Sequence, residues 1–580
     1  CGKRLKVMLP VLFCICATLL AACGGGSSGP STTKAPASQQ IFVSPVAGQA
    51  DLKTFDPGLA TDIPSINAID MIFTGLVQLN DKLQLVDQLA ASHSVGSDGT
   101  TWTFTLKPNL KFSDSTQLTS ADVAYSIDRA LDPKLKSSTA PAYLNLVKDS
   151  ALRNSGKLST LIGDSLLTPD PNTVVIKTSR KAAYFLDALA YPSSYVVEKS
   201  MIQKYGNNFA DHLAEGIGGD GPFKVSKYTH NKEIDFVPNP NYYGPEPQLS
   251  KVVMPFYVNA GADYPAYKND QVDTAGVPTE DISAAKALPN HQYQQYPELV
   301  VDYIAMNYLV KPFDNIKVRQ AFALALNKDE LVNTVYKGTR VATNHIVPNG
   351  MPGYDTNLKG PDGTTNTAGN TALAKQLFQQ GLQEEGLTVQ KLPPITFTVT
   401  SEGSADRRNW FAAEQQMWQN TLGVTIKVDD IDFDKLLSEI SSATGNAKGL
   451  QMWEINWVAD YPDAQDWLTL QFDKGASNNN MSYGQNSTSD ATTQQQTQRT
   501  LEQADQNLDP TGRLQQYNQA EQQLVNDVAW LPEDQRQVSS LNKPCVVGLV
   551  NNAQSLTPPD DWGQIYKTTA TPCANVSQYQ

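Results

Sequence analysis

Basic residues are scarce in this chain. Its 580 residues include 45 Lys and Arg against 59 Asp and Glu, so the formal net charge is −14, and no cluster of Lys or Arg follows residue 6. Charged residues of both signs together make up 18%, against about 25% in an average soluble protein. Because nucleic acids are bound through a surplus of positive charge on one face, a nucleic-acid partner is not expected.

Histidine is rarer still, and the common catalytic and metal-binding motifs are missing. No two of the five histidines have metal-ligand spacing, and neither HExxH, CxxC nor GxxxxGK[ST] occurs. The GxSxG pattern occurs only at residues 25–29, in a Gly- and Ser-rich stretch. One SxxK sequence, at residues 31–34, lies in a Ser- and Thr-rich stretch that would not hold it in place. We therefore expect no metal, no cofactor and no enzymatic activity. A lipoprotein hydrolase whose catalytic residues form no recognisable motif is the distant alternative.

Only one long hydrophobic run is present, and it lies near the start of the chain. Three basic residues among the first six precede an apolar stretch at residues 7–22. Its sixteen residues are short for a membrane span and suit the core of a signal peptide. The run ends in Leu-Ala-Ala followed by Cys23, which resembles the bacterial lipobox. We predict a lipoprotein signal peptide at residues 1–22 and a lipid on Cys23; an ordinary signal peptide is the alternative.

The next segment, residues 23–40, is rich in Gly, Ser, Thr and Pro and is predicted to be a flexible tether. A flexible chain of this length spans about 23 Å. The folded part would then begin near Ile41. The expected location is the outer face of the bacterial cytoplasmic membrane, through the lipid anchor, or the periplasm.

Cysteine is also rare, with six residues in all. Four of them lie at or before Cys23, which leaves Cys545 and Cys573. An even pair in an exported protein usually forms a disulfide, so we predict this bond; two separate buried thiols are the alternative.

Strand and helix patterns alternate along the remaining chain, which predicts an α/β fold. Residues 101–106 alternate between polar and apolar side chains, as a half-buried strand does. Residues 119–127 begin with a capping-box pattern, and residues 318–325 place apolar side chains at helical spacing. The Gln-rich stretch at residues 494–506 is predicted to form the solvated face of a helix.

An ordered series of short motifs carries a resemblance to a known family. The motifs lie at residues 56–62, 72–76, 98–106, 112–114, 118–126, 219–225, 239–244, 304–307, 312–321, 457–463 and 479–480. In this order they resemble the family 5 extracellular solute-binding proteins, the peptide- and nickel-binding components of ABC importers. One departure is Ser115, where the family usually has Gly after Asp114, and from it we expect a different local turn.

The resemblance implies a two-lobed, periplasmic-binding-protein-like α/β fold with a hinge between the lobes. Lobe one would be discontinuous, made of residues 41–80, 217–302 and 536–580. An inserted domain would occupy residues 81–216, and lobe two residues 303–535. The partners implied are a small solute held between the lobes and the permease subunits of an ABC transporter, and the protein is expected to be a monomer.

Peptide is the expected ligand, because peptide-binding members have an Asp at the position of Asp460 that binds the α-ammonium group. A buried ammonium needs such a charged partner. The alternative role for Asp460 is to cap a helix or turn. An oligosaccharide, a metal chelate or another small molecule is the alternative ligand. The further residues expected at the ligand are Trp457, Tyr461, Asn456, Phe73, Thr74, Asn307 and Asn480.

Overall fold

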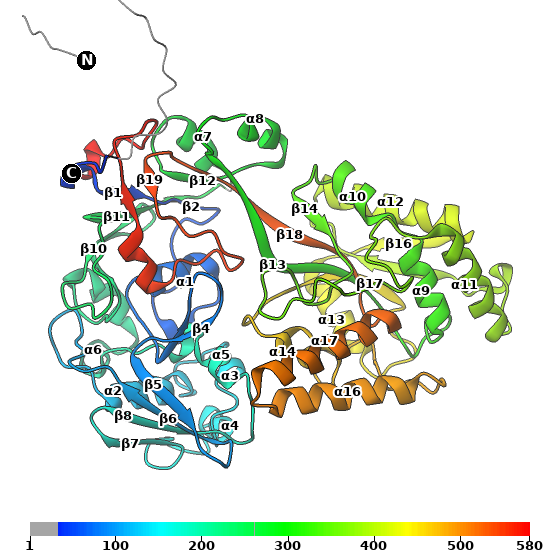
Figure 1. Cartoon of the computed structure of the whole chain (residues 1–580), viewed down its shortest axis with the longest axis horizontal. Helices are drawn as coiled ribbons and strands as arrows, with labels where there is room; N and C mark the ends of the chain where they lie inside the picture. The colour runs from blue at the N-terminus through cyan, green and yellow to red at the C-terminus, as the bar shows by residue number, and fades with distance from the viewer. Residues whose placement is uncertain (1–32, 260) are drawn as a thin grey trace, which may run out of the picture.

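The computed structural model describes residues 33–259 and 261–580. Two bodies lie side by side in Figure 1, joined by the long strands β13 (Tyr293–Met306) and β18 (Leu531–Asn542). The larger body contains the first and last segments of the chain, and the smaller one contains most of its second half, up to and including α17 (Pro510–Asp527). This is the two-lobed α/β fold expected from the sequence, and lobe one and lobe two are used below for the larger and the smaller body.

Lobe one is built around a five-stranded sheet in the order β1-β11-β10-β9, with β2 also paired to β11. Strands β1 and β11 are parallel, although they are far apart in the sequence. A core of buried aliphatic and aromatic side chains packs around this sheet and the helix α1. The elements are β1 (Ile41–Val43), β2 (Val46–Ala47), α1 (Ile63–Asp70), β9 (Phe223–Thr229), β10 (Glu233–Pro238), β11 (Lys251–Tyr257), α7 (Asp263–Lys268) and α8 (Ile282–Lys286).

A second sheet in the larger body has four antiparallel strands in the order β5-β6-β8-β7. Its core includes buried residues of α2, which begins with the predicted capping box between Thr119 and Asp122. The elements are β3 (Val77–Leu79), β4 (Leu85–Asp87), β5 (Ala90–Val95), β6 (Thr101–Leu106), α2 (Ser120–Ala130), α3 (Ala140–Tyr143), α4 (Ser150–Asn154), β7 (Leu166–Asp170), β8 (Thr173–Lys177), α5 (Phe185–Leu189) and α6 (Lys199–Tyr205).

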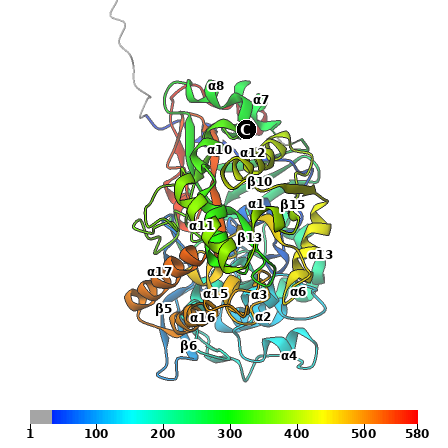
Figure 2. The same cartoon turned by 90° about the vertical axis from the view of Figure 1, so that its right-hand side faces the viewer.

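A seven-stranded sheet in the order β12-β18-β13-β17-β15-β16, with β14 also paired to β18, extends from β12 in lobe one into lobe two. Figure 2 views it from the side of this lobe and shows α16 and α17 on one flank and α12 and α13 on the other. The elements are β12 (Thr274–Gly276), α9 (Ile316–Leu324), α10 (Lys328–Thr334), β14 (Arg340–Ala342), α11 (Thr371–Glu384), β15 (Ile395–Val399), α12 (Ala405–Leu422), β16 (Ile426–Asp430), α13 (Phe433–Ala443), β17 (Met452–Val458), α14 (Ala464–Trp467), α15 (Thr469–Phe472), α16 (Ala491–Gln506) and α17 (Pro510–Asp527).

The two long strands β13 and β18 form an antiparallel ribbon that passes from one lobe to the other. Tyr293 pairs with Leu541 at the lobe-one end, and Ile304 pairs with Leu531 at the lobe-two end. Between them the register shifts at Pro297 to Val301, so the ribbon carries a bulge at the crossing. Bulges locally bend a ribbon, and this one lies where the two bodies meet.

One sequence expectation about a turn is wrong. The structure places Ser115 in the left-handed backbone region, at φ 76°. Its neighbour Asp114 accepts hydrogen bonds from the backbone and hydroxyl of Thr116. The turn therefore has the conformation that glycine favours, and serine adopts it here, so the departure from the family pattern does not change the turn.

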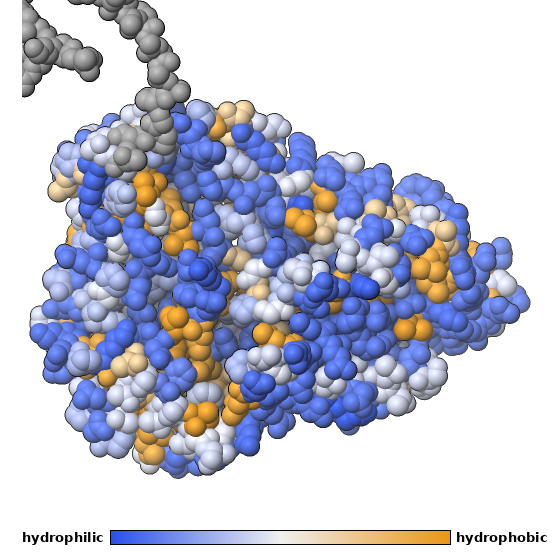
Figure 3. Space-filling view, viewed as in Figure 1, coloured by the Kyte–Doolittle hydropathy of each residue, from blue (hydrophilic) through white to orange (hydrophobic). Residues whose placement is uncertain are grey.

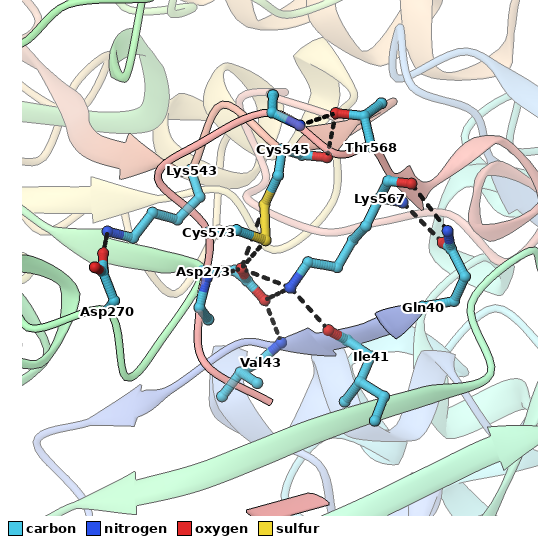
Figure 4. Close-up of a disulfide and its surroundings, with 12 residues drawn as sticks. Gln40, Ile41, Val43, Asp270, Asp273, Lys543, Cys545, Lys567, Thr568 and Cys573 are labelled. Atoms are coloured by element: carbon cyan, nitrogen blue, oxygen red, sulfur yellow. Dashed lines mark hydrogen bonds and ion pairs between the residues drawn. A yellow bond between two sulfur atoms is a disulfide. The ribbon is translucent and has the colours of Figure 1, made fainter. Parts of the chain in front are cut away.

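The C-terminal segment of the chain is fastened to lobe one around a buried carboxylate (Figure 4). Cys545 and Cys573 are joined by a disulfide, with their Cα atoms 5.5 Å apart. Beside it, Asp273 accepts hydrogen bonds from Lys567 Nζ at 2.9 Å and from the backbone of Val43 at 2.9 Å. The clasp, meaning this disulfide with Asp273 and Lys567, thus joins the first strand, the middle and the end of the chain. The short strands β19 (Val546–Val547) and β20 (Tyr566–Lys567) lie in the same segment.

Within residues 33–259 and 261–580, none of the helices combines the length and the apolar character that crossing a membrane requires.

Candidate functional site

A cavity of about 410 Å³ lies where the two lobes meet. Its walls come from α1 and β3, from the end of α5 and the turn after it, from the bulge of β13, from the segment after β17, and from residues 553–556. In Figure 3 a stripe of hydrophobic surface runs over β4 and α5, on the side of lobe one that faces lobe two. The volume lies within the range of small-molecule sites, and such sites are common at domain boundaries.

Asp460 lies in this cavity, two residues after the end of β17. Its carboxylate accepts a hydrogen bond from the hydroxyl of Tyr143 at 3.3 Å, and its backbone N–H donates to Asp466 at 3.1 Å. Burial raises the pKa of Asp460, and the hydrogen bond from Tyr143 acts in the opposite direction. The carboxylate is thus half-buried and held by one neutral donor, which leaves room for a positively charged partner.

Aromatic rings form the wall next to Asp460. Tyr461 lines the cavity, and its ring lies parallel to that of Tyr184 with centroids 6.1 Å apart. Tyr191 also lines the cavity and stacks on Tyr143 at a centroid distance of 3.6 Å. These stacked rings hold Tyr143 where its hydroxyl reaches Asp460, and their faces are electron-rich, which favours a cation nearby.

Asp70, the last residue of α1, lines the same cavity from lobe one. Its side chain is almost fully buried, at 1% exposure, and Oδ1 has no hydrogen-bond partner among the described residues. Burial raises the pKa of Asp70 to about 7, and the neighbouring Tyr195 hydroxyl acts in the opposite direction. The hydroxyl of Tyr195 donates to Gln78 at 3.0 Å. A buried carboxyl without a full set of partners is destabilising unless something else binds it.

Two further acids, Glu298 and Asp187, also line the cavity. Burial raises the pKa of each, and repulsion from Asp463 adds to the effect on Asp187. Among the described residues that line the cavity there is no lysine, arginine or histidine. The cavity therefore combines apolar walls with four carboxyl groups, an arrangement that suits a ligand with an apolar body and positive charge.

Of the eight residues predicted to meet a ligand, Asp460 and Tyr461 line this cavity. Trp457 precedes them on β17 and is not among the residues that line the cavity; its indole N–H donates to Asp466 at 3.1 Å. Asn456 lines a different cavity of about 310 Å³ in lobe two. Three arginines line that second cavity, and each is already in an ion pair with a buried carboxylate.

The other four predicted residues are outside both cavities and have structural partners. Phe73 is fully buried in the core of lobe one, and Thr74 donates from its N–H and its hydroxyl to Asp220. Asn307, which follows the end of β13, donates to the backbone carbonyls of Asn446 and Leu450. Asn480 accepts a hydrogen bond from Thr444 at 2.7 Å. Cys23 lies outside the described residues.

Sequence reasoning did not identify Asp70, Asp187, Glu298 or Tyr191 as cavity residues. Only Asp70 had a local signal, because it is a single acid within the apolar run Ala-Ile-Asp-Met-Ile-Phe at residues 68–73. A charge in such a run has to be buried with a partner or at a site. The other three belong to segments whose mixture of polar and apolar residues gives no such signal. They come together only when the chain folds.

Comparison with known proteins gives one family. The sequence pattern of "Bacterial extracellular solute-binding proteins, family 5 Middle" matches residues 84–479. The chain is 25% identical over 486 residues to the oligopeptide-binding protein OppA of Bacillus subtilis strain 168, covering 82% of this chain and 86% of the relative. It is 25% identical over 481 residues to the dipeptide-binding protein DppE of the same strain, covering 83% and 84%.

Solved structures show the same fold. The murein tripeptide binding protein MppA in an unliganded open form matches with a TM-score of 0.77 at 22% identity, over 93% of this chain and 99% of that one. A second structure, of the murein tripeptide binding protein MppA of Escherichia coli, matches with a TM-score of 0.64, over 93% of this chain and 100% of that one. OppA of Listeria monocytogenes bound to peptide matches with a TM-score of 0.61 at 22% identity, over 92% and 99%.

Proposed function

The chain belongs to the family 5 bacterial extracellular solute-binding proteins, and from this membership we propose that it captures peptides in the cavity between its lobes and delivers them to the membrane subunits of an ABC importer. The relatives OppA and DppE are named for oligopeptides and dipeptides. A similar structure from Bacillus anthracis is the substrate-binding domain of an oligopeptide ABC transporter. Binding and delivery involve no bond-making, in agreement with the lack of catalytic motifs.

The observation that carries this proposal is the place of Asp460. It lies in the interlobe cavity, its carboxylate has one neutral donor, and apolar and aromatic side chains surround it. A peptide's α-ammonium would supply the missing charge and form a charge-assisted hydrogen bond with this carboxylate. The peptide's side chains would contact the apolar walls, and closure of the lobes about the β13–β18 ribbon would remove water from the pair.

The test is the change Asp460→Asn, which keeps the shape of the side chain and removes its charge. We expect peptides with a free amino terminus to bind about a hundredfold to a thousandfold more weakly, because one partner of a buried pair is lost. An N-acetylated peptide should bind the wild type poorly and lose little more on the variant. Asp434→Asn, an exposed acid on α13, is the matched control and should leave both affinities unchanged.

Calorimetric titration of both peptides into the wild type and both variants gives the affinities. If free-amine peptides bind the Asp460→Asn protein within about threefold of the wild type, less than about 0.7 kcal/mol, this residue is not the ammonium site. If neither peptide binds the wild type at all, peptide is not the ligand.

The proposal includes a lipid anchor on Cys23 and the domain division given by the family resemblance. The change Cys23→Ser in a bacterial host should move the protein from the membrane fraction to the soluble fraction, whereas Cys16→Ser should not. A Cys23→Ser protein that still sediments with membranes would rule the anchor out.

The proposed boundaries of lobe two, residues 303 and 535, fall inside β13 and β18, which agrees with a hinge made of these two strands.

A further inference from the structure

Asp70 has no evident structural task. It lies at the last position of α1, and the backbone N–H that caps this helix donates to Ile69. Among the described residues its Oδ1 is without a partner, and the neighbouring hydroxyl of Tyr195 donates to Gln78. A carboxylate that is 1% exposed and lacks partners costs folding free energy unless it takes up a proton or a cation or strong donor binds it.

One ligand in the cavity would meet both Asp70 and Asp460. Asp70 belongs to the lobe-one wall and Asp460 to the lobe-two wall of the same cavity. Tyr191 lines the same cavity, and burial and the charges of both carboxyl groups raise the pKa of its hydroxyl. Glu298, on the bulge of β13, adds a third carboxyl group to this lining.

We propose that Asp70 is a second cation site, and that the cavity selects peptides carrying a basic side chain at the first or second residue in addition to the free α-ammonium. The assignment of the α-ammonium to Asp460 rests on the proposed function. The side-chain ammonium or guanidinium of the peptide would bind Asp70, and Glu298 and Asp187 would strengthen the attraction. The apolar lining would cover the aliphatic part of a Lys or Arg side chain.

The experiment compares peptides that differ only in this charge. Lys-Ala-Ala, Ala-Lys-Ala and their norleucine counterparts are titrated into the wild type and into Asp70→Asn. For the wild type we expect at least one lysine peptide to bind about tenfold or more tightly than its norleucine counterpart, the usual gain from a charge-assisted hydrogen bond. On Asp70→Asn this ratio should fall to within about threefold, while the norleucine peptides keep their affinity.

Asp473→Asn is the matched control. Burial also raises the pKa of Asp473, to about 6, and its Oδ1 also lacks a hydrogen-bond partner among the described residues, but it does not line the cavity. This variant should preserve the preference for lysine. Because Asn removes a buried charge without changing the side-chain volume, Asp70→Asn should fold. Should it not, the wild-type ratios alone decide, since equal or tighter binding of both norleucine peptides would overturn the inference.

An unchanged lysine preference on Asp70→Asn also overturns the inference and leaves peptide binding intact. If none of the peptides binds the wild type, the proposed function fails, and a pair of simple amines then tests Asp70. Cadaverine, with two ammonium groups, should raise the melting temperature of the wild type more than pentylamine, and this difference should vanish in Asp70→Asn. No such difference in the wild type would overturn the second cation site as well.

Discussion

Ser115 shows how one residue can depart from a family pattern without changing the backbone. At φ 76° a side chain with a Cβ costs roughly 1–2 kcal/mol relative to the usual right-handed region. The serine hydroxyl accepts a hydrogen bond from Asn241 Nδ2 at 3.1 Å, but this contact is exposed and offsets only part of that cost. Glycine adopts the same conformation without strain.

We therefore expect Ser115→Gly to stabilise the protein by about 0.5–1 kcal/mol. The neighbouring change Thr116→Gly should destabilise it by at least as much, because Thr116 is not left-handed and its hydroxyl donates to Asp114. Urea unfolding of the two variants and the wild type measures both effects. A lower midpoint for Ser115→Gly would show that the hydroxyl contact outweighs the strain.

At the level of elements, the Gln-rich helix α16 has the predicted solvated face, but two of its six glutamines are buried on the other side. Gln494 is fully buried and Gln498 nearly so. The amide of Gln498 donates to the carbonyls of Phe472 and Tyr483 at 2.8 and 3.0 Å. Gln498 thus shares these two buried carbonyls with the side-chain amide of Asn479, which donates to both of them.

The change Gln498→Ala should accordingly destabilise lobe two by about 1–3 kcal/mol, since two buried hydrogen bonds are lost and Asn479 alone continues to donate to the two carbonyls. Gln496→Ala, on the exposed side of the same helix, should change stability by less than about 0.5 kcal/mol. Thermal unfolding followed by circular dichroism compares the two variants. Equal, small effects would mean that water replaces the amide of Gln498.

These elements also show which parts of the fold could be predicted from the sequence. The strand at residues 101–106 and the helix near residue 318 could be predicted, because their apolar spacing is a local property and both appear as β6 and α9. The buried side of α16 could not be predicted, because glutamine is a polar residue and its hydrogen-bond partners lie on another segment. Asp460 was reached through the family resemblance, whereas Asp70 and Glu298 become neighbours of it only when distant segments form the cavity.

For the whole molecule, buried carboxyl groups make stability depend on pH. Burial raises the pKa values of Asp70, Asp220 and Glu521 to about 7 each. Such a group holds its proton in the folded state while the unfolded chain has released it, so stability is lost as pH rises from the unfolded value toward 7. Burial of His345 lowers its pKa to about 4 and opposes this trend, and Lys328, lowered to about 7, acts only above pH 7.

The unliganded protein should therefore be less stable at pH 7 than at pH 5, by at least about 2 kcal/mol. This follows because each carboxyl group that stays protonated only in the folded state contributes up to about 1.4 kcal/mol per pH unit, and three such groups outweigh one histidine. Urea unfolding at the two pH values, at constant ionic strength and after removal of bound ligand, measures the change. A midpoint that rises toward pH 7 would contradict the expected ionisation of these acids.

The clasp also determines where the molecule bears mechanical load. Ala35 donates a backbone hydrogen bond to Lys567 at 2.8 Å, and Lys567 is bound to Asp273 beside the disulfide. A pull on the N-terminal segment is therefore transmitted first to this cross-linked corner of lobe one. The clasp adjoins the lobe-one end of the β13–β18 ribbon, because β18 ends just before Cys545 and Asp273 directly precedes β12, which pairs with β18. Tension on the leading segment, from flow or from motion of an attached surface, would therefore be borne by the disulfide and the buried ion pair before it reaches the ribbon between the lobes.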